Sequence, residues 1–266
     1  MINIHLISDI YSTINKVDYK APIGTDLIIL AGDIASGDKG LIWARQTFYT
    51  HPIIYIAGNH EYYWHDLSDI ETMRKTAQEL DIVFLDNDEF TLNEVKFLGT
   101  TLWTDFNKFS LKDVNSEWQT HNDYKQISSK EWWGKTDNRN EALKLMKPIS
   151  GFHFEADFFS PTVAYLLHQK SVQWLWKKLA EPYKGKTVII SHHIPSHQGF
   201  SIKYGKYKDY SRCSDLDILI KTNSIDLWLH GHCHESLDYK IGNTRIISNT
   251  NSVISNNFNP DLLIKI

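Results

Sequence analysis

The chain has 266 residues, a formal net charge of −4, 42% hydrophobic residues and 13% aromatic residues. This composition can bury a large core, which excludes an intrinsically disordered chain, and the net charge excludes an overall basic field that would attract nucleic acid. Two cysteines are too few for a disulfide framework, the first residues lack the pattern of a secretory signal, and no apolar run approaches the roughly 20 residues of a membrane span, so we expect a cytoplasmic protein without a membrane anchor.

Short apolar runs rich in Ile, Val and Leu predict buried strands. They are Ile2 to Ile7, Asp26 to Ala31, Pro52 to Ala57, Thr187 to Ser191 and Asp226 to His230. Strands that are apolar throughout are typical of sheets covered on both faces. Helical patterns lie between these runs, and alternation of strands with helices predicts an α/β core with parallel pairing.

Two stretches have the apolar spacing of helices. The first contains Ile70, Met73, Ala77 and Leu80, and Ser68 with Glu71 is spaced as a capping box at its start. The second begins at Ser160-Pro161, where serine suits the N-cap position and proline suits the first turn.

The last third of the chain predicts antiparallel strands. The runs Leu237 to Ile241 and Thr244 to Ser248 flank Gly242-Asn243, which is typical of a hairpin turn, and Leu262 to Ile266 forms a third run. The segment 103–160 has no sustained period, and we expect it to form a small cap within one continuous domain spanning residues 1–266.

Polar clusters follow the predicted strands. They are Ser8-Asp9-Ile10-Tyr11, Gly32-Asp33, Gly58-Asn59-His60-Glu61, Ser191-His192-His193-Ile194-Pro195 and His230-Gly231-His232-Cys233-His234. Each cluster alone is typical of a turn or cap. Because the carboxyl ends of parallel strands meet at one edge of a sheet, the clusters together predict a site of carboxylate, amide and imidazole ligands, with enough ligands for two divalent ions.

In this order the clusters resemble the motifs of the calcineurin-like metallophosphoesterases. The match runs from Asp9 to His234, and the stretches 99–104, 121–124, 171–175 and 238–239 are similar to a bacterial branch of predicted phosphohydrolases. The resemblance implies a four-layer α-β-β-α sandwich with a dinuclear metal site at the sheet ends. It also implies a single domain, since the motifs span nearly the whole chain.

The resemblance also implies a role for each residue of the motifs. Asp33 would bridge two ions, drawn from Mn, Fe, Zn, Ni or Co, with Asp9 and His234 on the first ion. The second ion would be completed by Asn59, His192 and His232. His60 would be the catalytic residue, facing the leaving group, since imidazole suits proton transfer near neutral pH. We expect His193 to be structural and Cys233 to be a small buried filler.

Tyr11 departs from the family pattern, because this position is usually a histidine that binds the first metal. Three outcomes follow: Tyr11 binds the metal as phenolate, Tyr11 turns aside and water takes the position, or the first ion is weakly held and activity falls. Phenolate ligation requires a metal that lowers the ordinary phenol pKa of about 10.

The resemblance implies hydrolysis of a phosphomonoester or phosphodiester by attack of a metal-bridging hydroxide, with a small phosphate ester or a nucleotide as substrate. The alternative is a binding or regulatory protein of the same fold, weakened by Tyr11. Nucleic acid is a less favoured substrate, because the composition offers no basic track. A set of aromatic and basic residues either walls the site or packs the cap, and we favour packing. These residues are Trp103, Phe106, Trp132, Trp133, Lys203, Tyr204, Lys206, Tyr207 and Arg212.

Overall fold

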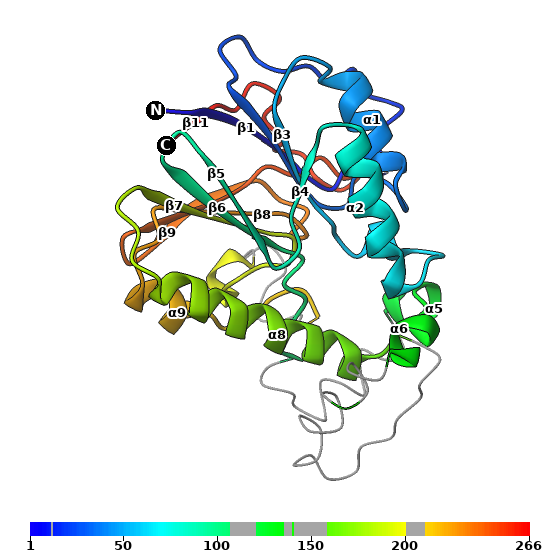
Figure 1. Ribbon diagram of the computed structural model, residues 1–266. Helices are drawn as coiled ribbons and strands as arrows, with labels where there is room; N and C mark the ends of the chain where they lie inside the picture. Colours follow the sequence, from blue (N-terminus) through cyan, green and yellow to red (C-terminus); the bar gives the residue numbers. More distant parts are fainter. Residues whose placement is uncertain (12, 107–120, 136–139, 141–158, 201–210) are drawn as a thin grey trace.

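The computed structural model in Figure 1 describes residues 1–11, 13–106, 121–135, 140, 159–200 and 211–266. Its core is two mixed β-sheets packed face to face. The first sheet has the order β11-β1-β2-β3-β4. Its strands are β1 (Asn3–Ile7), β2 (Leu27–Ala31), β3 (Ile53–Ile56), β4 (Val83–Phe84) and β11 (Ile264–Lys265). All neighbours pair in parallel except β11, which runs antiparallel to β1.

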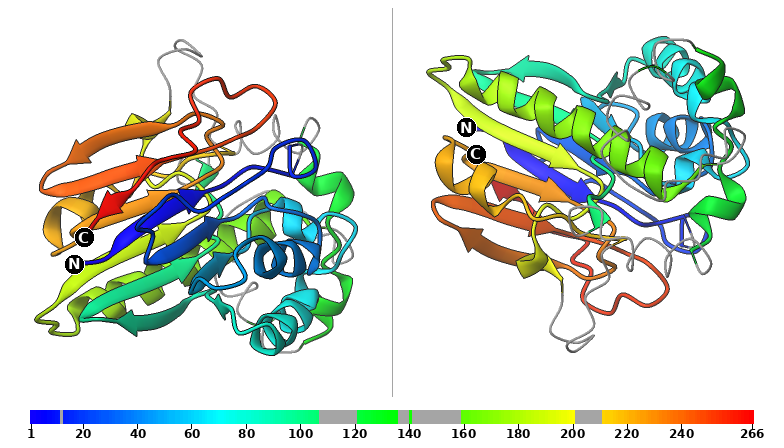
Figure 2. Two further views of the ribbon diagram at one scale, coloured as in Figure 1. Left: turned by 90° about the horizontal axis from the view of Figure 1, so that it is seen from above. Right: turned by 90° about the horizontal axis from the view of Figure 1, so that it is seen from below.

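The second sheet has the order β5-β6-β7-β8-β10-β9. Its strands are β5 (Asp88–Leu92), β6 (Val95–Thr100), β7 (Lys186–Ser191), β8 (Leu227–His230), β9 (Leu237–Ile241) and β10 (Thr244–Ser248). The four inner strands are parallel, and β5 and β9 are antiparallel edge strands. The two ends of the chain lie side by side, where β11 pairs with β1 (Figure 2).

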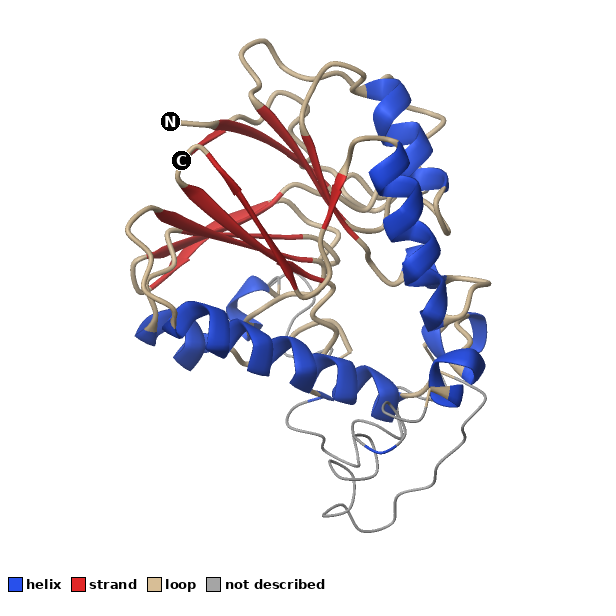
Figure 3. Cartoon of the chain, in the orientation of Figure 1, coloured by secondary structure: helices blue, strands red, loops and turns tan. Residues whose placement is uncertain are grey.

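Helices cover the outer face of each sheet (Figure 3). The first sheet carries α1 (Lys39–Thr47) and α2 (Ile70–Glu79), and the second carries α8 (Pro161–Ala180) and α9 (Asp217–Thr222). The short helices α5 (Asp123–Gln126) and α6 (Lys130–Gly134) lie near the ends of α2 and α8. Single 3₁₀ turns are η1 (His60–Tyr62), η2 (Leu67–Asp69) and η3 (His197–Gly199). The layers therefore follow the α-β-β-α order that the motifs predicted.

Burial on both faces explains why the inner strands are apolar throughout. On β7, Val188 and Ile190 pack between the sheets, while Ile189 faces the helix layer with Leu175 of α8. Successive side chains of a strand point to opposite faces, so both faces need apolar residues. The five predicted strands are confirmed as β1, β2, β3, β7 and β8. Separately, no helix in the described ranges combines the length and the apolar character that a bilayer span requires.

One local expectation was wrong. Ser68 and Glu71 do not form the capping box, because the chain first makes the turn η2, which is capped by a box of Asp66 and Asp69. The run Leu262 to Ile266 contains an antiparallel strand as expected, and this strand pairs with β1 in the first sheet and not with the hairpin of β9 and β10. The hairpin itself, with Gly242 at φ 60°, is confirmed.

The start of α8 agrees with the prediction. Ser160 is the N-cap residue, and its Oγ accepts a hydrogen bond from the backbone N–H of Val163 at 3.3 Å. Pro161 occupies the first turn. Since the first N–H groups of a helix have no partner within it, the serine hydroxyl satisfies one of them and the proline removes another.

Candidate metal centre

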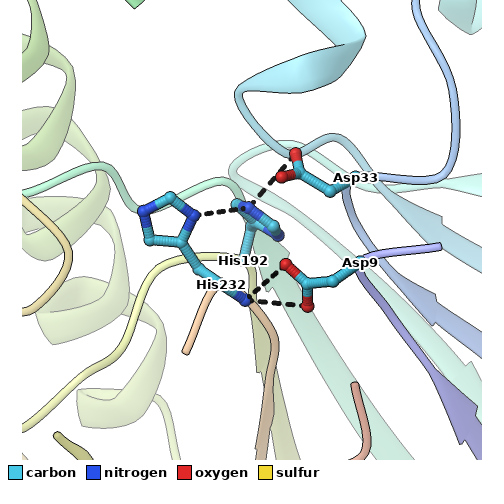
Figure 4. Close-up of side chains that lie close together, drawn as sticks. All are labelled: Asp9, Asp33, His192 and His232. Atoms are coloured by element: carbon cyan, nitrogen blue, oxygen red, sulfur yellow. Dashed lines mark hydrogen bonds and ion pairs between the residues drawn. The ribbon is translucent and has the colours of Figure 1, made fainter. Parts of the chain in front are cut away.

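The polar clusters meet where the parallel strands of both sheets end. Asp9 and Asp33 follow β1 and β2 in one sheet, while His192 and His232 follow β7 and β8 in the other. All four side chains are buried, and one potential ligand atom of each lies within 4.8 Å of those of the others (Figure 4). The described residues thus contain a buried Asp/His cluster that is able to hold metal.

Four residues that follow these strands have a strained backbone. The φ angles are 59° at Asp9, 57° at Asp33, 64° at His232 and 53° at His234. This left-handed region is sparsely populated by residues other than glycine and costs on the order of 1 to 3 kcal/mol per residue. Strain retained at four neighbouring positions is typical of a functional site, where the surrounding fold holds side chains in required directions.

Nε2 of His192 faces the centre of the cluster. Its Nδ1 lies 2.8 Å from the carbonyl oxygen of Ala31, and because a carbonyl only accepts, Nδ1 must carry the proton. Its Nε2 lies 3.1 Å from Oδ1 of Asn59, 3.1 Å from Nδ1 of His232 and 3.3 Å from Oδ1 of Asp33. Electron-rich atoms gathered this closely need a cation between them, either a proton or a metal ion.

In the absence of a metal, a proton on His192 has this role. Burial lowers the pKa of His192, but the negative charges of Asp33 and Asp9 oppose burial and raise the pKa to about 10. The same pair acts in reverse on Asp33: burial alone would raise its pKa, and the charges of His192 and His60 hold the pKa well below its ordinary value.

Asp33 has one carboxylate oxygen that the fold leaves open. Its Oδ1 accepts a hydrogen bond from the backbone N–H of His60 at 2.9 Å. Its Oδ2 is buried and accepts no hydrogen bond from the described residues, while Nε2 of His60 lies 3.7 Å away. A buried carboxylate oxygen without a partner is costly, and a bound cation would satisfy it. The donor set around Asp33 therefore fits a bound metal ion.

Asp9 lies on the other side of the cluster, with His234 beside it. Both oxygens of Asp9 accept from the backbone N–H of His232, at 3.1 and 3.0 Å, and Ser8 Oγ donates to Oδ2 at 2.6 Å. Nε2 of His234 lies 3.7 Å from Oδ1 of Asp9. Burial raises the pKa of Asp9. The structure thus places together the two residues expected on the first ion.

Tyr11 stacks on the candidate catalytic residue. Its ring centroid lies 3.9 Å from that of His60 with 25° between the planes, and Tyr63 covers the other face of the imidazole at 4.1 Å and 23°. Burial, with the charges of Asp33 and Asp9, raises the pKa of Tyr11 to about 12, so the phenol is protonated at neutral pH. The ring of Tyr11 therefore packs on His60, and the three outcomes for metal binding at this position stay predictions.

The family model of the calcineurin-like phosphoesterases matches residues 3–236. The chain belongs to this family. An uncharacterized protein, L509, of Acanthamoeba polyphaga mimivirus is 25% identical over 232 residues, covering 80% of this chain and 73% of the viral protein. The crystal structure of phosphopantetheinyl hydrolase (PptH) from Mycobacterium tuberculosis is similar with a TM-score of 0.64 and 13% identity, covering 94% of this chain and 89% of that one. At that identity the likeness shows the fold alone.

A third carboxylate beside this phosphoesterase-family site, Glu61, was missed by the sequence reasoning although it stands in the Gly58 to Glu61 motif. It is fully buried and accepts hydrogen bonds from the backbone N–H of Asp33 at 2.9 Å, Ile34 at 2.7 Å and Gly58 at 2.6 Å. Tyr55 OH donates to it at 2.8 Å. Glu61 therefore joins the loops after β2 and β3, which carry two of the candidate ligands.

The remaining predicted residues of the phosphoesterase lie as follows. His193 is buried, with Nδ1 3.2 Å from the carbonyl of Thr101, and burial lowers its pKa to about 3, so it is a neutral packed residue as expected. Cys233 is buried, and its thiol donates to the carbonyl of Glu235. Arg212 Nη1 lies 3.5 Å from the carbonyl of His232.

The aromatic side chains expected to pack the cap do so where the structure describes them. The buried members of one core cluster include Trp103, Phe106, Trp132 and Trp133. The positions Lys203, Tyr204, Lys206 and Tyr207 lie outside the described residues.

Proposed function

We propose that the chain is a metal-dependent phosphoesterase that hydrolyses a small phosphomonoester, phosphodiester or nucleotide. One observation carries the proposal: polar atoms of Asn59, His232 and Asp33 converge on Nε2 of His192, beside an open oxygen of Asp33. Membership of the calcineurin-like phosphoesterase family, whose members are typically hydrolases, supports it.

Two divalent cations would be held around Asp33. Asp9 and His234 would contribute to one site, and Asn59, His192 and His232 to the other. Cations bound there would lower the pKa of a water molecule and withdraw charge from the phosphoryl group. Only two of the expected ligands are carboxylates, so two divalent ions would leave the set of ligands with a net positive charge, and a local charge of this kind would let a chain of net charge −4 attract an anionic ester.

His60 is the group placed to act on the leaving oxygen. Its side chain is 22% exposed, so substrate can reach it, and its Nε2 lies beside the bridging carboxylate of Asp33. The rings of Tyr11 and Tyr63 restrict the imidazole from both faces. A positioned imidazole would donate a proton or a hydrogen bond to the oxygen that develops negative charge.

A second candidate function is favoured by the position of Tyr11. With its ring stacked on His60, the first metal position has Asp9, His234 and the bridging Asp33 as its only expected side-chain ligands among the described residues. A weakly held first ion would leave a protein that binds a phosphate ester without efficient hydrolysis. Such a protein would contain one metal ion per chain in elemental analysis.

The test is hydrolysis of bis(p-nitrophenyl) phosphate by the full chain with Mn²⁺. We expect turnover that requires the metal, is abolished in Asp33→Ala and is retained in the control Asp18→Ala, which removes an exposed carboxylate that pairs with Lys20. No turnover with any divalent metal, or full turnover of Asp33→Ala, would contradict the proposal.

A further inference from the structure

A carboxylate outside the predicted ligand set contacts two parts of the site. Asp123 begins α5 and is 4% exposed. Its Oδ1 accepts hydrogen bonds from Nδ2 of Asn59 at 2.9 Å and from the hydroxyl of Tyr63 at 2.7 Å, and its Oδ2 lies 3.3 Å from Nδ1 of His121. One buried oxygen therefore holds a candidate metal ligand and also a ring that packs on His60.

The bond to Asn59 decides which end of the amide faces the metal position. An amide carries an oxygen acceptor and a nitrogen donor at sites of similar shape, and only the oxygen can bind a cation. Since the carboxylate of Asp123 only accepts, it takes the NH₂ group and directs Oδ1 of Asn59 toward His192 Nε2 at 3.1 Å. Without this acceptor, either end of the amide could face the site.

The hydrogen bond between Asp123 and Tyr63 affects the orientation of the His60 imidazole. The phenol donates to Asp123, and the ring lies parallel to His60 at 4.1 Å between centroids. The hydrogen bond holds the phenol oxygen in place and so limits displacement of the ring, and a ring held at this distance restricts the movement of the imidazole stacked on it. The orientations of Asn59 and His60 are thereby tied to a single side chain.

We infer that Asp123 is a positioning residue of this site: it orients the amide of Asn59 toward the metal and, through Tyr63, holds the plane of His60. The effect on His60 rests on the proposed phosphoesterase function, whereas the effect on Asn59 concerns metal affinity alone. Asp123 belongs to the segment that the sequence indicated only as a cap, so this segment contributes directly to the site.

The competing explanation is that Asp123 only anchors α5 to the core. The chain offers a matched control that tests this explanation. Asp66 is another carboxylate that ties this segment to the core: it accepts from Ser68 N–H at 2.9 Å, Ser128 Oγ at 2.7 Å and Trp132 N–H at 3.1 Å. The hydrogen-bond partners of its carboxylate among the described residues are Ser68, Ser128, Glu131 and Trp132, none of which belongs to the candidate metal centre. Asp66→Ala therefore loosens the segment without touching the amide of Asn59.

The first experiment is calorimetric titration of the metal-depleted full chain with Mn²⁺. Substitutions behind a metal ligand typically weaken affinity by about 10- to 100-fold, and we expect this loss in Asp123→Ala. Asp123→Asn, which keeps the side-chain shape but loses the charge, should show a smaller loss and carries the test if the alanine variant does not fold. Asp66→Ala should bind Mn²⁺ as the native chain does. Native affinity in both Asp123 variants, or an equal loss in Asp66→Ala, overturns the inference.

The second experiment tests the hydrogen bond of Asp123 to Tyr63 separately from its hydrogen bond to Asn59. Tyr63→Phe keeps the ring and removes the donor, so Mn²⁺ affinity should be unchanged, while kcat falls without a change in KM and falls more for esters with poorer leaving groups. Weakened Mn²⁺ binding in Tyr63→Phe contradicts the assignment of metal affinity to the Asn59 bond. If the native chain binds Mn²⁺ but hydrolyses no ester, the proposed function fails while the titrations still decide the role of Asp123. If it binds no divalent metal, both fail.

Discussion

Replacing Tyr11 tests what the unusual first-motif residue does. The Tyr11 ring stacks on His60, the candidate catalytic residue, at 3.9 Å between centroids and 25° between planes. An aromatic pair of this kind is worth about 0.5 to 1.5 kcal/mol beyond its buried area. If the pair holds His60 in its working position, its loss in Tyr11→Ala should slow turnover by about 2- to 13-fold. Tyr11→Phe keeps the ring and should keep the rate.

The assay is hydrolysis of a series of aryl phosphate esters at saturating Mn²⁺, with metal content measured on the same samples. Because His60 is expected to act on the leaving oxygen, the loss in Tyr11→Ala should grow as the leaving group becomes more basic. If stacking on His60 is the role of Tyr11, neither Tyr11→Phe nor Tyr11→Ala should change the number of bound ions.

Two results would refute this reasoning. If Tyr11→Phe loses as much activity as Tyr11→Ala, together with one metal ion, the hydroxyl is a ligand and the stack is secondary. Tyr11→His supplies the residue usual in the family, and we expect it to raise the affinity for the first ion. Unchanged metal content and unchanged turnover in Tyr11→His would show that the first site is not weakened by the tyrosine.

Two further predictions concern stability. Burial would raise the pKa of Asp66, but hydrogen bonds from Ser68 and Ser128 outweigh burial and lower it. The ionised Asp66 therefore contributes fully to the free energy of unfolding above the ordinary carboxyl pKa of about 3.9. This contribution is lost as the pH falls through the lowered pKa of the folded state. Asp66→Ala should lower the free energy of unfolding by about 2 kcal/mol at pH 7 and by less at acid pH. Urea denaturation of both proteins across the pH range measures this difference. A difference that does not change with pH would contradict a charge effect. Glu61→Gln leaves buried backbone donors of the β2 and β3 loops without partners and should cost about 3 kcal/mol in urea denaturation, with a loss below 1 kcal/mol contradicting its role as the link between these loops.

Much of the fold was readable because burial and strand ends leave local signals. The five apolar runs are inner strands, and the hairpin after Leu237 and the cap at Ser160 were recognised from their turn and capping residues. Strand β6 was missed because Lys96 and Gly99 interrupt its apolar pattern. In the structure the amine of Lys96 lies over the ring of Tyr183 at 4.7 Å, and Gly99 has no room for a side chain against Leu85. These are packing relations between distant segments.

The sequence alone determined the order of the strand-end motifs, and with it the family and the convergence of carboxylate and imidazole groups at the carboxyl ends of the strands. That these strands belong to two different sheets was decided by the tertiary structure. The tertiary structure decided how those groups are held: Tyr11 against His60, Glu61 between two loops, and Asp123 behind Asn59 across 64 positions of the chain. The physical reason is that periodicity and turn chemistry report whether a residue is buried or ends a strand. They do not report which distant atom a buried polar group will meet, and here that partner fixes the orientation of the amide and of the imidazole.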